Sequence, residues 1–212
     1  MSQPLATGPD PTPDSNSSNA PASARGRLVV LSGASGSGKS TIVDLLLERY
    51  PEIPVRRSVS TTTRAPRTGE VPDVNYHFVD RDQFEAERDR GDFLEWAKVH
   101  DHFYATSIQR VDLLRDQGLS VILVIDVQGA MQVREKVPDA CLIFVQAPGF
   151  EVLEQRLRER KTDDEATIQL RLSNARLEVA MADRYDQQIT NDHLDRVVDQ
   201  LASILNQNPF RG

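Results

Sequence analysis

Apolar residues along the 212-residue chain gather in short continuous runs, separated by stretches in which they recur at helical spacing. One run begins at Leu28, and others occupy residues 121–127, 142–147 and, more weakly, 188–190. Continuous apolar runs of this kind are typical of strands that are buried on both faces of a parallel sheet. Because helical patterns separate the runs, we predict an α/β fold with a mainly parallel sheet.

Three helices can be placed between these strands. The first covers residues 42–47 and fades at Tyr50, and the second is expected to be capped by Thr106 and to end at Gly118. The third opens with a capping box over residues 162–165, which makes Thr162 its expected cap. Its expected buried stripe consists of Ile168, Leu172, Ala175 and Val179.

Two regions break the alternation of strands and helices. Residues 1–25 are rich in Pro, Ser, Ala and Asn, and we expect a disordered tail without the features of a secretory signal. Residues 57–103 are polar and rich in turn formers, with strand-like pieces at 76–79 and 93–96. Such a segment between core strands predicts an inserted lobe.

Residues 28–41 read LVVLSGASGSGKST, a strand followed by Gly33-x4-Gly38-Lys39-Ser40 and the start of a helix. This order builds a P-loop, in which backbone N–H groups converge on phosphate oxygens. Lys39 can reach the β- and γ-phosphates, and the Ser40 hydroxyl can ligate Mg²⁺. The predicted ATP-binding residues of the loop are Gly33, Ala34, Ser35, Gly36, Ser37, Gly38, Lys39, Ser40 and Thr41.

The composition of the chain narrows the class of protein and its expected compartment. A net charge of −7 argues against a general nucleic-acid binder. The single cysteine, Cys141, excludes a disulfide framework within one chain and suits a reducing compartment, so we expect a cytoplasmic protein. Since the chain has no apolar run of about 18 residues, we expect no membrane span. Nothing in the pattern indicates an oligomeric state.

The predicted lobe carries an arginine motif, Ser60-Thr-Thr-Thr-Arg64-Ala-Pro-Arg67-Thr-Gly-Glu70. The two arginines, stiffened by Pro66, could present two forked donors to one phosphate. They could equally be surface arginines in a solvated turn, and the motif alone does not decide between these two interpretations.

In combination, the motifs resemble those of guanylate kinases. The arginine motif is followed by Tyr76, by the segment Phe93-Leu-Glu-Trp-Ala97 and by the step Tyr104-Ala-Thr106, all at matching spacing. The likeness runs from about Arg27 to Leu205. It implies transfer of the γ-phosphoryl group of ATP to GMP, and to dGMP, with Mg²⁺ as cofactor and a role in purine nucleotide metabolism.

The resemblance also implies roles for individual residues. Arg64, Arg67, Tyr76 and Tyr104 would hold the GMP phosphate. Ser60, Glu95 and Thr106 would recognise guanine, Asp126 would lie beside the acceptor, and Asn191 would lie near adenine. A carboxylate suits guanine because it can accept the N1–H and the exocyclic NH₂ together, and its partial burial would make the match selective.

A second arginine cluster contains Arg156, Arg158, Arg160 and, further on, Arg171. Taken alone, it could be a charged helix face that is neutralised by Glu154 and Glu159. The spacing of 156, 160 and 171 resembles that of a lid which closes over ATP. The implied catalytic residues are then Lys39, Arg64, Arg156, Arg160 and Arg171, which neutralise charge on the transferring phosphoryl group.

These patterns together predict the organisation of the chain. The core would comprise residues 26–56, 106–150 and 182–212, the GMP-binding lobe residues 57–105, and the lid residues 151–181.

The sequence departs from the family pattern at four positions. The four residues are Ala34, Ala105, Val124 and Lys161, of which Val124 replaces an acidic residue.

Two other functions remain to be weighed. A scaffold module that resembles guanylate kinases and binds peptides would show a degraded P-loop, whereas this loop is complete. A kinase for another phosphorylated acceptor, such as a ribose bisphosphate, would have no use for Glu95 and Thr106. Both alternatives therefore rank below the nucleotide kinase.

Overall fold

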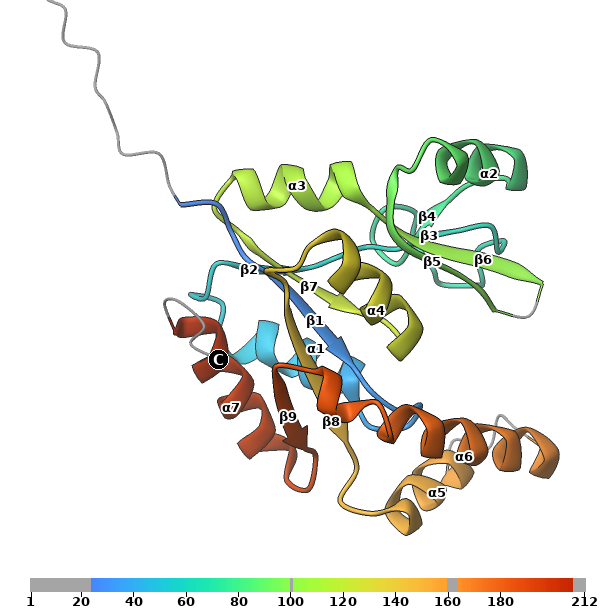
Figure 1. Cartoon of the computed structure of the whole chain (residues 1–212), viewed down its shortest axis with the longest axis vertical. Coiled ribbons are helices and arrows are strands. Elements are labelled where there is room, and N and C mark those ends of the chain that lie inside the picture. Colours follow the sequence, from blue (N-terminus) through green and yellow to red (C-terminus); the bar gives the residue numbers. More distant parts are fainter. Residues whose placement is uncertain (1–23, 100, 160–163, 208–212) are drawn as a thin grey trace, which may run out of the picture.

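The computed structural model describes residues 24–99, 101–159 and 164–207, and its centre is a parallel sheet (Figure 1). The strands lie in the order β2-β7-β1-β8-β9, and every adjacent pair is parallel. Their bounds are β1 Leu28–Ser32, β2 Val55–Arg57, β7 Ser120–Val124, β8 Cys141–Gln146 and β9 Gln187–Thr190. The predicted α/β fold with a mainly parallel sheet is confirmed.

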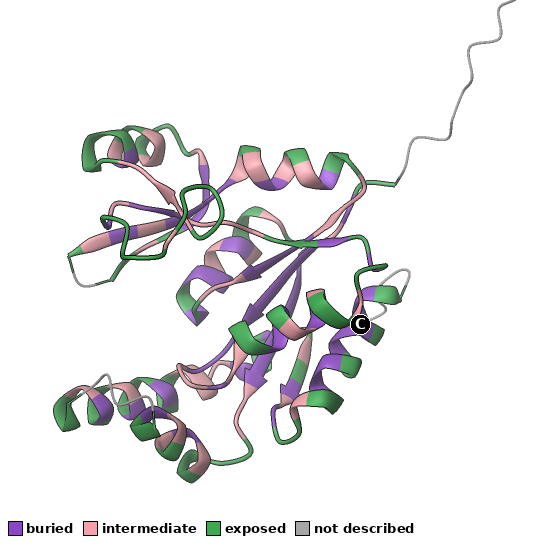
Figure 2. Cartoon of the chain, turned by 180° about the vertical axis from the view of Figure 1, so that it is seen from behind, coloured by how far each residue is buried: buried purple, intermediate pink, exposed green. Residues whose placement is uncertain are grey.

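Helices cover both faces of this sheet and enclose its buried strands (Figure 2). Successive side chains of a strand point to opposite faces. Accordingly, Val29 and Leu31 of β1 pack with α1 (Lys39–Arg49) and α7 (Leu194–Asn206). Leu28 and Val30 join the opposite cluster, which includes residues of α3 (Ile108–Asp116) and α4 (Val127–Lys136). The continuous apolar run of β1 is therefore buried on both faces of the sheet.

A second, smaller sheet has the strand order β4-β3-β6-β5. Its bounds are β3 Thr61–Thr62, β4 His77–Phe78, β5 Phe93–Val99 and β6 His102–Ser107. Helix α2 (Arg81–Asp89) packs on it through Phe84, whose ring centroid lies 4.9 Å from that of Phe93 and 5.2 Å from that of Phe103. The second sheet thus has a small apolar core of its own.

Helices α5 (Phe150–Glu159) and α6 (Glu165–Val179) form a pair that extends from the same side of the central sheet as the second sheet does (Figure 1). Their shared cluster contains Leu153, Leu157, Ile168, Leu172 and Ala175, together with Ala34 of the P-loop. The short helix η1 (Ala182–Arg184) leads from α6 back to β9. Packing on Ala34 therefore ties this helical pair to the P-loop.

Two predicted boundaries are wrong by a few residues. Thr106 lies in β6, and Ser107 caps α3 by accepting the Arg110 N–H. The run predicted as one strand over 121–127 divides, because Asp126 caps α4 by accepting the Gly129 N–H at 2.8 Å. The side-chain hydrogen bond of Asp126 starts the helix at Val127, whereas the strand has already ended at Val124.

The third predicted cap, Thr162, lies outside the described residues. Helix α6 begins after Asp164, which accepts the Thr167 N–H at 2.8 Å. Of the predicted stripe, Ile168, Leu172 and Ala175 are buried, whereas Val179 is half-buried and packs on a different cluster.

The chain's first described residues are attached to the core. Arg25, the last residue of the expected tail, forms ion pairs with Asp112 and Asp116 of α3. The next residue, Gly26, donates its N–H to the Arg115 carbonyl at 2.7 Å. Among the described residues, no helix combines the length and apolar character that crossing a membrane requires.

Candidate active site

The P-loop connects β1 to α1 and packs tightly on its surroundings. Gly33 has a φ of 135°, and a Cβ atom there would lie 2.1 Å from the Val145 carbonyl oxygen. Gly38 has a φ of 94°, and a Cβ atom there would lie 2.4 Å from Nδ2 of Asn191. Only glycine fits both the backbone conformation and the space at these two positions.

The charged group of the loop is folded back on the loop itself. Lys39 Nζ donates to the carbonyl oxygens of Gly33 at 2.6 Å and Ala34 at 3.0 Å. Ser40 and Thr41 are exposed in the first turn of α1, where the helix presents N–H groups and partial positive charge. The loop thus offers backbone donors, an ammonium group and a hydroxyl to one anionic ligand.

A hydroxyl oxygen at Ser40 fits the oxygen ligands that Mg²⁺ prefers. In the described part of the chain, no cluster of three or more His, Cys, Asp or Glu side chains is arranged to hold a metal ion. A cation at Ser40 would therefore take most of its ligands from nucleotide oxygens and water.

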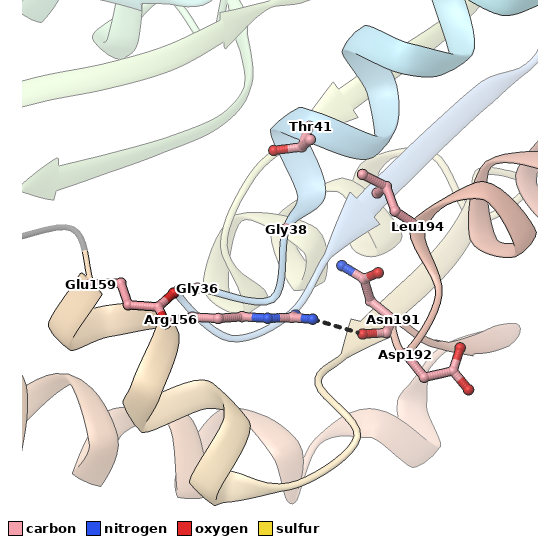
Figure 3. A pocket seen from close by; sticks show the side chains of 8 residues that line it. All are labelled: Gly36, Gly38, Thr41, Arg156, Glu159, Asn191, Asp192 and Leu194. Atoms are coloured by element: carbon pink, nitrogen blue, oxygen red, sulfur yellow. Dashed lines mark hydrogen bonds between the residues drawn. The ribbon is translucent and has the colours of Figure 1, made fainter.

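Beside the P-loop lies a cavity of about 450 Å³ (Figure 3). Asn191, which is buried, donates from Nδ2 to the Ser37 carbonyl at 2.7 Å, and Arg156 Nη2 donates to the Asn191 carbonyl at 3.1 Å. Buried Nη1 of Arg156 has no hydrogen-bond partner among the described residues. The cavity is lined by Gly36, Gly38, Thr41, Arg156, Glu159, Asn191, Asp192 and Leu194.

The other arginines of the second cluster are placed differently. Arg158 forms ion pairs with Glu154 and Glu165, and the guanidinium group lowers the pKa of Glu165 to about 2. Arg158 therefore belongs to a charged surface, as the alternative interpretation had it. Arg171 is half-buried on α6, and Arg160 lies outside the described residues.

On the second sheet, the structure brings together Arg64, Tyr76 and Tyr104. Arg64 Cζ lies 5.3 Å from the centroid of the Tyr76 ring, and the Tyr76 and Tyr104 centroids are 6.0 Å apart. Arg64 Nη2 donates to Glu70 Oε1 at 2.7 Å and Oε2 at 3.0 Å, which raises the pKa of Arg64. Arg67 is exposed, and its backbone N–H donates to Glu70 at 2.8 Å.

Glu95 and Thr106 form a buried pair across the second sheet. They face each other in the antiparallel register of β5 and β6, and the Thr106 hydroxyl donates to Glu95 Oε1 at 2.6 Å. Their exposed fractions are 6% and 1%. Burial raises the pKa of Glu95 to about 7, and the charge of Asp126 adds to this, whereas Thr106 and Lys136 oppose it.

The remaining predicted residues lie between the two sheets. Ser60, Tyr76 and Val124 border a cavity of about 290 Å³, together with Arg57, Ser58, Val59, Val74 and Asn75. Val124 ends β7 there and is half-buried. Asp126 is exposed at the N-terminus of α4. The structure therefore brings Arg156 and Asn191 to the P-loop, Arg64 to Tyr76 and Tyr104, and Glu95 to Thr106. Arg171, on α6, takes part in none of the contacts that define these groups.

Comparisons with known proteins show the family of this chain. The sequence model described as guanylate kinase matches residues 25–208. The chain belongs to the guanylate kinase family. It is 45% identical over 181 residues to a guanylate kinase of Rubrobacter xylanophilus, covering 85% of this chain and 94% of that protein. It is also 45% identical over 185 residues to one of Synechococcus sp., covering 87% and 84%.

A solved structure shares the fold of this guanylate kinase. The crystal structure of guanylate kinase from Anaplasma phagocytophilum aligns with a TM-score of 0.69 and 32% sequence identity, covering 89% of this chain and 88% of that one. The resemblance seen in the sequence is thereby confirmed at the level of family and fold.

Some residues of this guanylate kinase were missed by the sequence analysis. Glu70 was part of the arginine motif, but its pairing with Arg64 appears only in the folded turn. Glu178 of α6 lies close enough to Lys39 for that charge to lower its pKa, while the larger effect of burial raises it. Asp192 borders the P-loop cavity. Only Glu70 carried a local signal, namely its position three residues after Arg67.

Proposed function

We propose that this guanylate kinase transfers the γ-phosphoryl group of ATP to the phosphate of GMP, and also of dGMP, giving ADP and the diphosphate. The observation that carries the proposal is the buried carboxylate of Glu95, held by the Thr106 hydroxyl, in a fold that also contains an intact P-loop. Binding of the ATP phosphates would explain the P-loop, and recognition of the guanine base would explain the buried Glu95 carboxylate.

Guanine explains why a carboxylate should be kept in an environment that opposes its charge. Its N1–H and exocyclic NH₂ are parallel donors, and one carboxylate accepts both, whereas adenine lacks this pair. Burial of Glu95 makes the charged form costly until such donors arrive. A wrong base would leave the carboxylate unpaired, so this arrangement supports selection of GMP. Ser60 and Thr106 would complete recognition of the base.

The phosphate of GMP is proposed to bind the cluster of Arg64, Tyr76 and Tyr104, with Arg67 at its exposed rim. Glu70 holds the Arg64 fork in the described structure and would keep the guanidinium group oriented. Asp126 lies at the start of α4 and would border the acceptor. The residues proposed to bind the phosphate come from separate segments of the chain, as does Asp126. Closure of the second sheet toward the core would bring their side chains around the GMP phosphate.

On the ATP side, the P-loop amides, Lys39 and Asn191 would hold the nucleotide, while Arg156 and Arg171 from the helical lid would neutralise charge on the transferring group. Arg156 has a buried donor to offer, and its position beside Asn191 also brings it to the nucleotide pocket. Mg²⁺ bound at Ser40 would supply charge neutralisation of the phosphate oxygens. Arg160 is proposed to act with them.

The reaction needs no covalent intermediate on the protein. The bond between the γ-phosphorus and its bridging oxygen breaks as an oxygen of the GMP phosphate forms the new bond. Catalysis is then positioning and charge neutralisation, with the lobe (57–105) and the lid (151–181) excluding water. We place this activity in cytoplasmic recycling of GMP.

A coupled assay of ADP formation tests the proposal. ATP and Mg²⁺ are supplied with GMP, dGMP, AMP or UMP as the acceptor, and the expected kcat/KM is highest for GMP, lower for dGMP and very small for the other two. Equal turnover of GMP and AMP, or turnover of a ribose bisphosphate in preference to GMP, would refute the proposed function.

A further inference from the structure

Helix α4 of the core lies against β5, the edge strand of the second sheet. The Trp96 N–H donates to Gln132 Oε1 at 3.1 Å, and Gln132 Nε2 donates to the Trp96 carbonyl at 3.0 Å. Lys136 Nζ donates to the Phe93 carbonyl at 2.6 Å. An edge strand leaves backbone groups without a partner strand, so these α4 side chains take the place of one.

Gly129 lies on the same face of α4, since positions 129, 132 and 136 are separated by three and four residues. A Cβ atom at Gly129 would lie 2.9 Å from Glu95 Oε2, 3.4 Å from Glu95 Cδ and 3.3 Å from Ile125 Cδ1. Real Cβ atoms essentially never approach a neighbour within 3.0 Å. The lack of a side chain at Gly129 therefore leaves room for the Glu95 carboxylate.

The carboxylate is held between two fixed elements. On one side, Glu95 Oε1 accepts the Thr106 hydroxyl from β6 at 2.6 Å. On the other side, Oε2 faces the bare backbone of Gly129, whose N–H is tied to Asp126 Oδ1 at 2.8 Å. A group added at position 129 would have to displace the carboxylate, because the helix backbone is anchored.

We propose that Gly129 is a positioning residue for guanine specificity. It lets α4 approach β5 closely and so keeps the Glu95 carboxylate in the orientation that accepts both guanine donors. This inference rests on the proposed role of Glu95 as the residue that recognises guanine. A methyl group at position 129 moves the far end of a flexible side chain, so the fold survives while the carboxylate leaves its position.

The test is Gly129→Ala, measured with GMP and with IMP, which lacks the exocyclic amino group. The expected kcat/KM for GMP falls about ten- to a hundredfold, mostly through KM, and the preference for GMP over IMP falls with it. The KM for ATP stays at the wild-type value. The unfolding temperature is unchanged or higher, because alanine favours a helix over glycine, whereas a merely structural defect would lower it.

Matched variants isolate the effect. Gln128→Ala changes an exposed neighbour on α4 and should leave the GMP to IMP preference unchanged. Gly129→Ala combined with Glu95→Gln should lose no more activity toward GMP than Glu95→Gln alone, because Gly129 acts through Glu95. Gln132→Ala removes the pairing with Trp96 and should raise the KM for GMP by about threefold or more while sparing ATP.

The outcomes separate this inference from the proposed function. If the wild-type protein phosphorylates GMP and Gly129→Ala keeps both its KM for GMP and its preference over IMP, the inference is overturned and the function stands. If Gly129→Ala does not fold, a wild-type KM for GMP in Gln132→Ala overturns it. If the wild-type protein neither phosphorylates GMP nor binds it in titration calorimetry, function and inference fall together.

Discussion

The P-loop and the proposed guanine site are built from different parts of the chain. The P-loop is a run of consecutive residues whose ligands are mainly backbone N–H groups, and its cation is satisfied by carbonyls of the same loop. The proposed guanine site pairs Glu95 with Thr106 on neighbouring strands and borders on α4, a separate helix. A site made of backbone is fixed by local sequence, whereas a site made of side chains depends on register and packing.

The two regions also differ in how they hold charge. Lys39 keeps its ammonium group beside two carbonyl oxygens, so its charge is stabilised without a ligand. Glu95 is buried, and the pKa of its carboxyl is raised to about 7. The charge of Lys39 is therefore compensated within the folded protein, whereas a charged Glu95 lowers its stability.

The largest effect is expected at Lys39. Lys39→Ala should lower kcat by a factor of about 10²–10³ with every acceptor, because the lost ammonium group acts on charge that develops in the transition state. The unfolding temperature should change only modestly, since Lys39 donates to two carbonyl oxygens of its own loop and its charge also acts on Glu178 of α6. Steady-state kinetics and a thermal melt check both, with exposed Lys98→Ala as the matched control. Normal turnover in a folded Lys39→Ala protein would remove the P-loop from the mechanism.

A pH effect should follow from Glu95. Because the pKa of its carboxyl is about 7 and only the charged form accepts both guanine donors, kcat/KM for GMP should fall about tenfold per pH unit below 7. A rate profile between pH 5 and 8 measures this. The profile of the Glu95→Gln variant should lack this dependence.

The stability of the folded protein should fall as the pH rises through the titration of Glu95, whereas the activity toward GMP should rise. The folded pKa of Glu95 lies above the ordinary value of 4.5, so the folded state binds the proton more tightly. The favourable contribution is present below the unfolded pKa and is lost as the pH rises from 4.5 to about 7. At pH 8, Glu95→Gln should therefore have a free energy of unfolding up to about 3 kcal/mol above that of the wild type, and it should unfold at a higher temperature. A less stable variant at pH 8 would show that the charged carboxylate is stabilising.

A smaller effect is expected at Val124. Val124→Asp places a carboxylate at the cavity that Ser60 and Tyr76 border, where the half-buried side chain also packs against the core cluster of Val29 and Leu31. If Ser40, nucleotide oxygens and water already hold Mg²⁺, kcat should change by less than about threefold, with at most a lower Mg²⁺ requirement. Mg²⁺ titrations of activity check this. Unfolding of the variant would instead identify position 124 as part of the apolar core.

The smallest effect is expected from removing residues 1–23. Turnover and unfolding temperature should remain at wild-type values, because this segment has almost no apolar residues to bury. Removal of residues 1–26 is the matched comparison, since it also deletes the ion pairs of Arg25 and the hydrogen bond from Gly26 to Arg115. Only the longer deletion should lower the unfolding temperature. A loss of stability in the shorter deletion would mean that residues 1–23 contact the folded part.

The same contrast explains what the sequence could predict. The P-loop and four of the five strands of the central sheet, β1, β7, β8 and β9, follow from local apolar runs and were located from the sequence. The short edge strand β2, with the sequence Val55-Arg-Arg57, lacks such a run and was missed. The cap of α3 was misplaced by one residue because Thr106 uses its hydroxyl for Glu95 and leaves Ser107 to start the helix. The sequence suggested a partly desolvated Glu95 from its apolar neighbours. No local pattern indicated that Gln132 would pair with Trp96, because that contact requires α4 to pack on the edge of a different sheet.

The central claim is that Glu95 selects guanine while the P-loop acts on any triphosphate donor independently of the acceptor base. The most direct measurement is kcat/KM for GMP and for AMP in wild type and in Glu95→Gln, together with the KM for ATP. Glutamine offers one acceptor and one NH₂, which opposes a guanine donor, so GMP use should fall by about 10²-fold or more while the KM for ATP stays constant. A Glu95→Gln protein that keeps the wild-type preference for GMP over AMP would contradict the account.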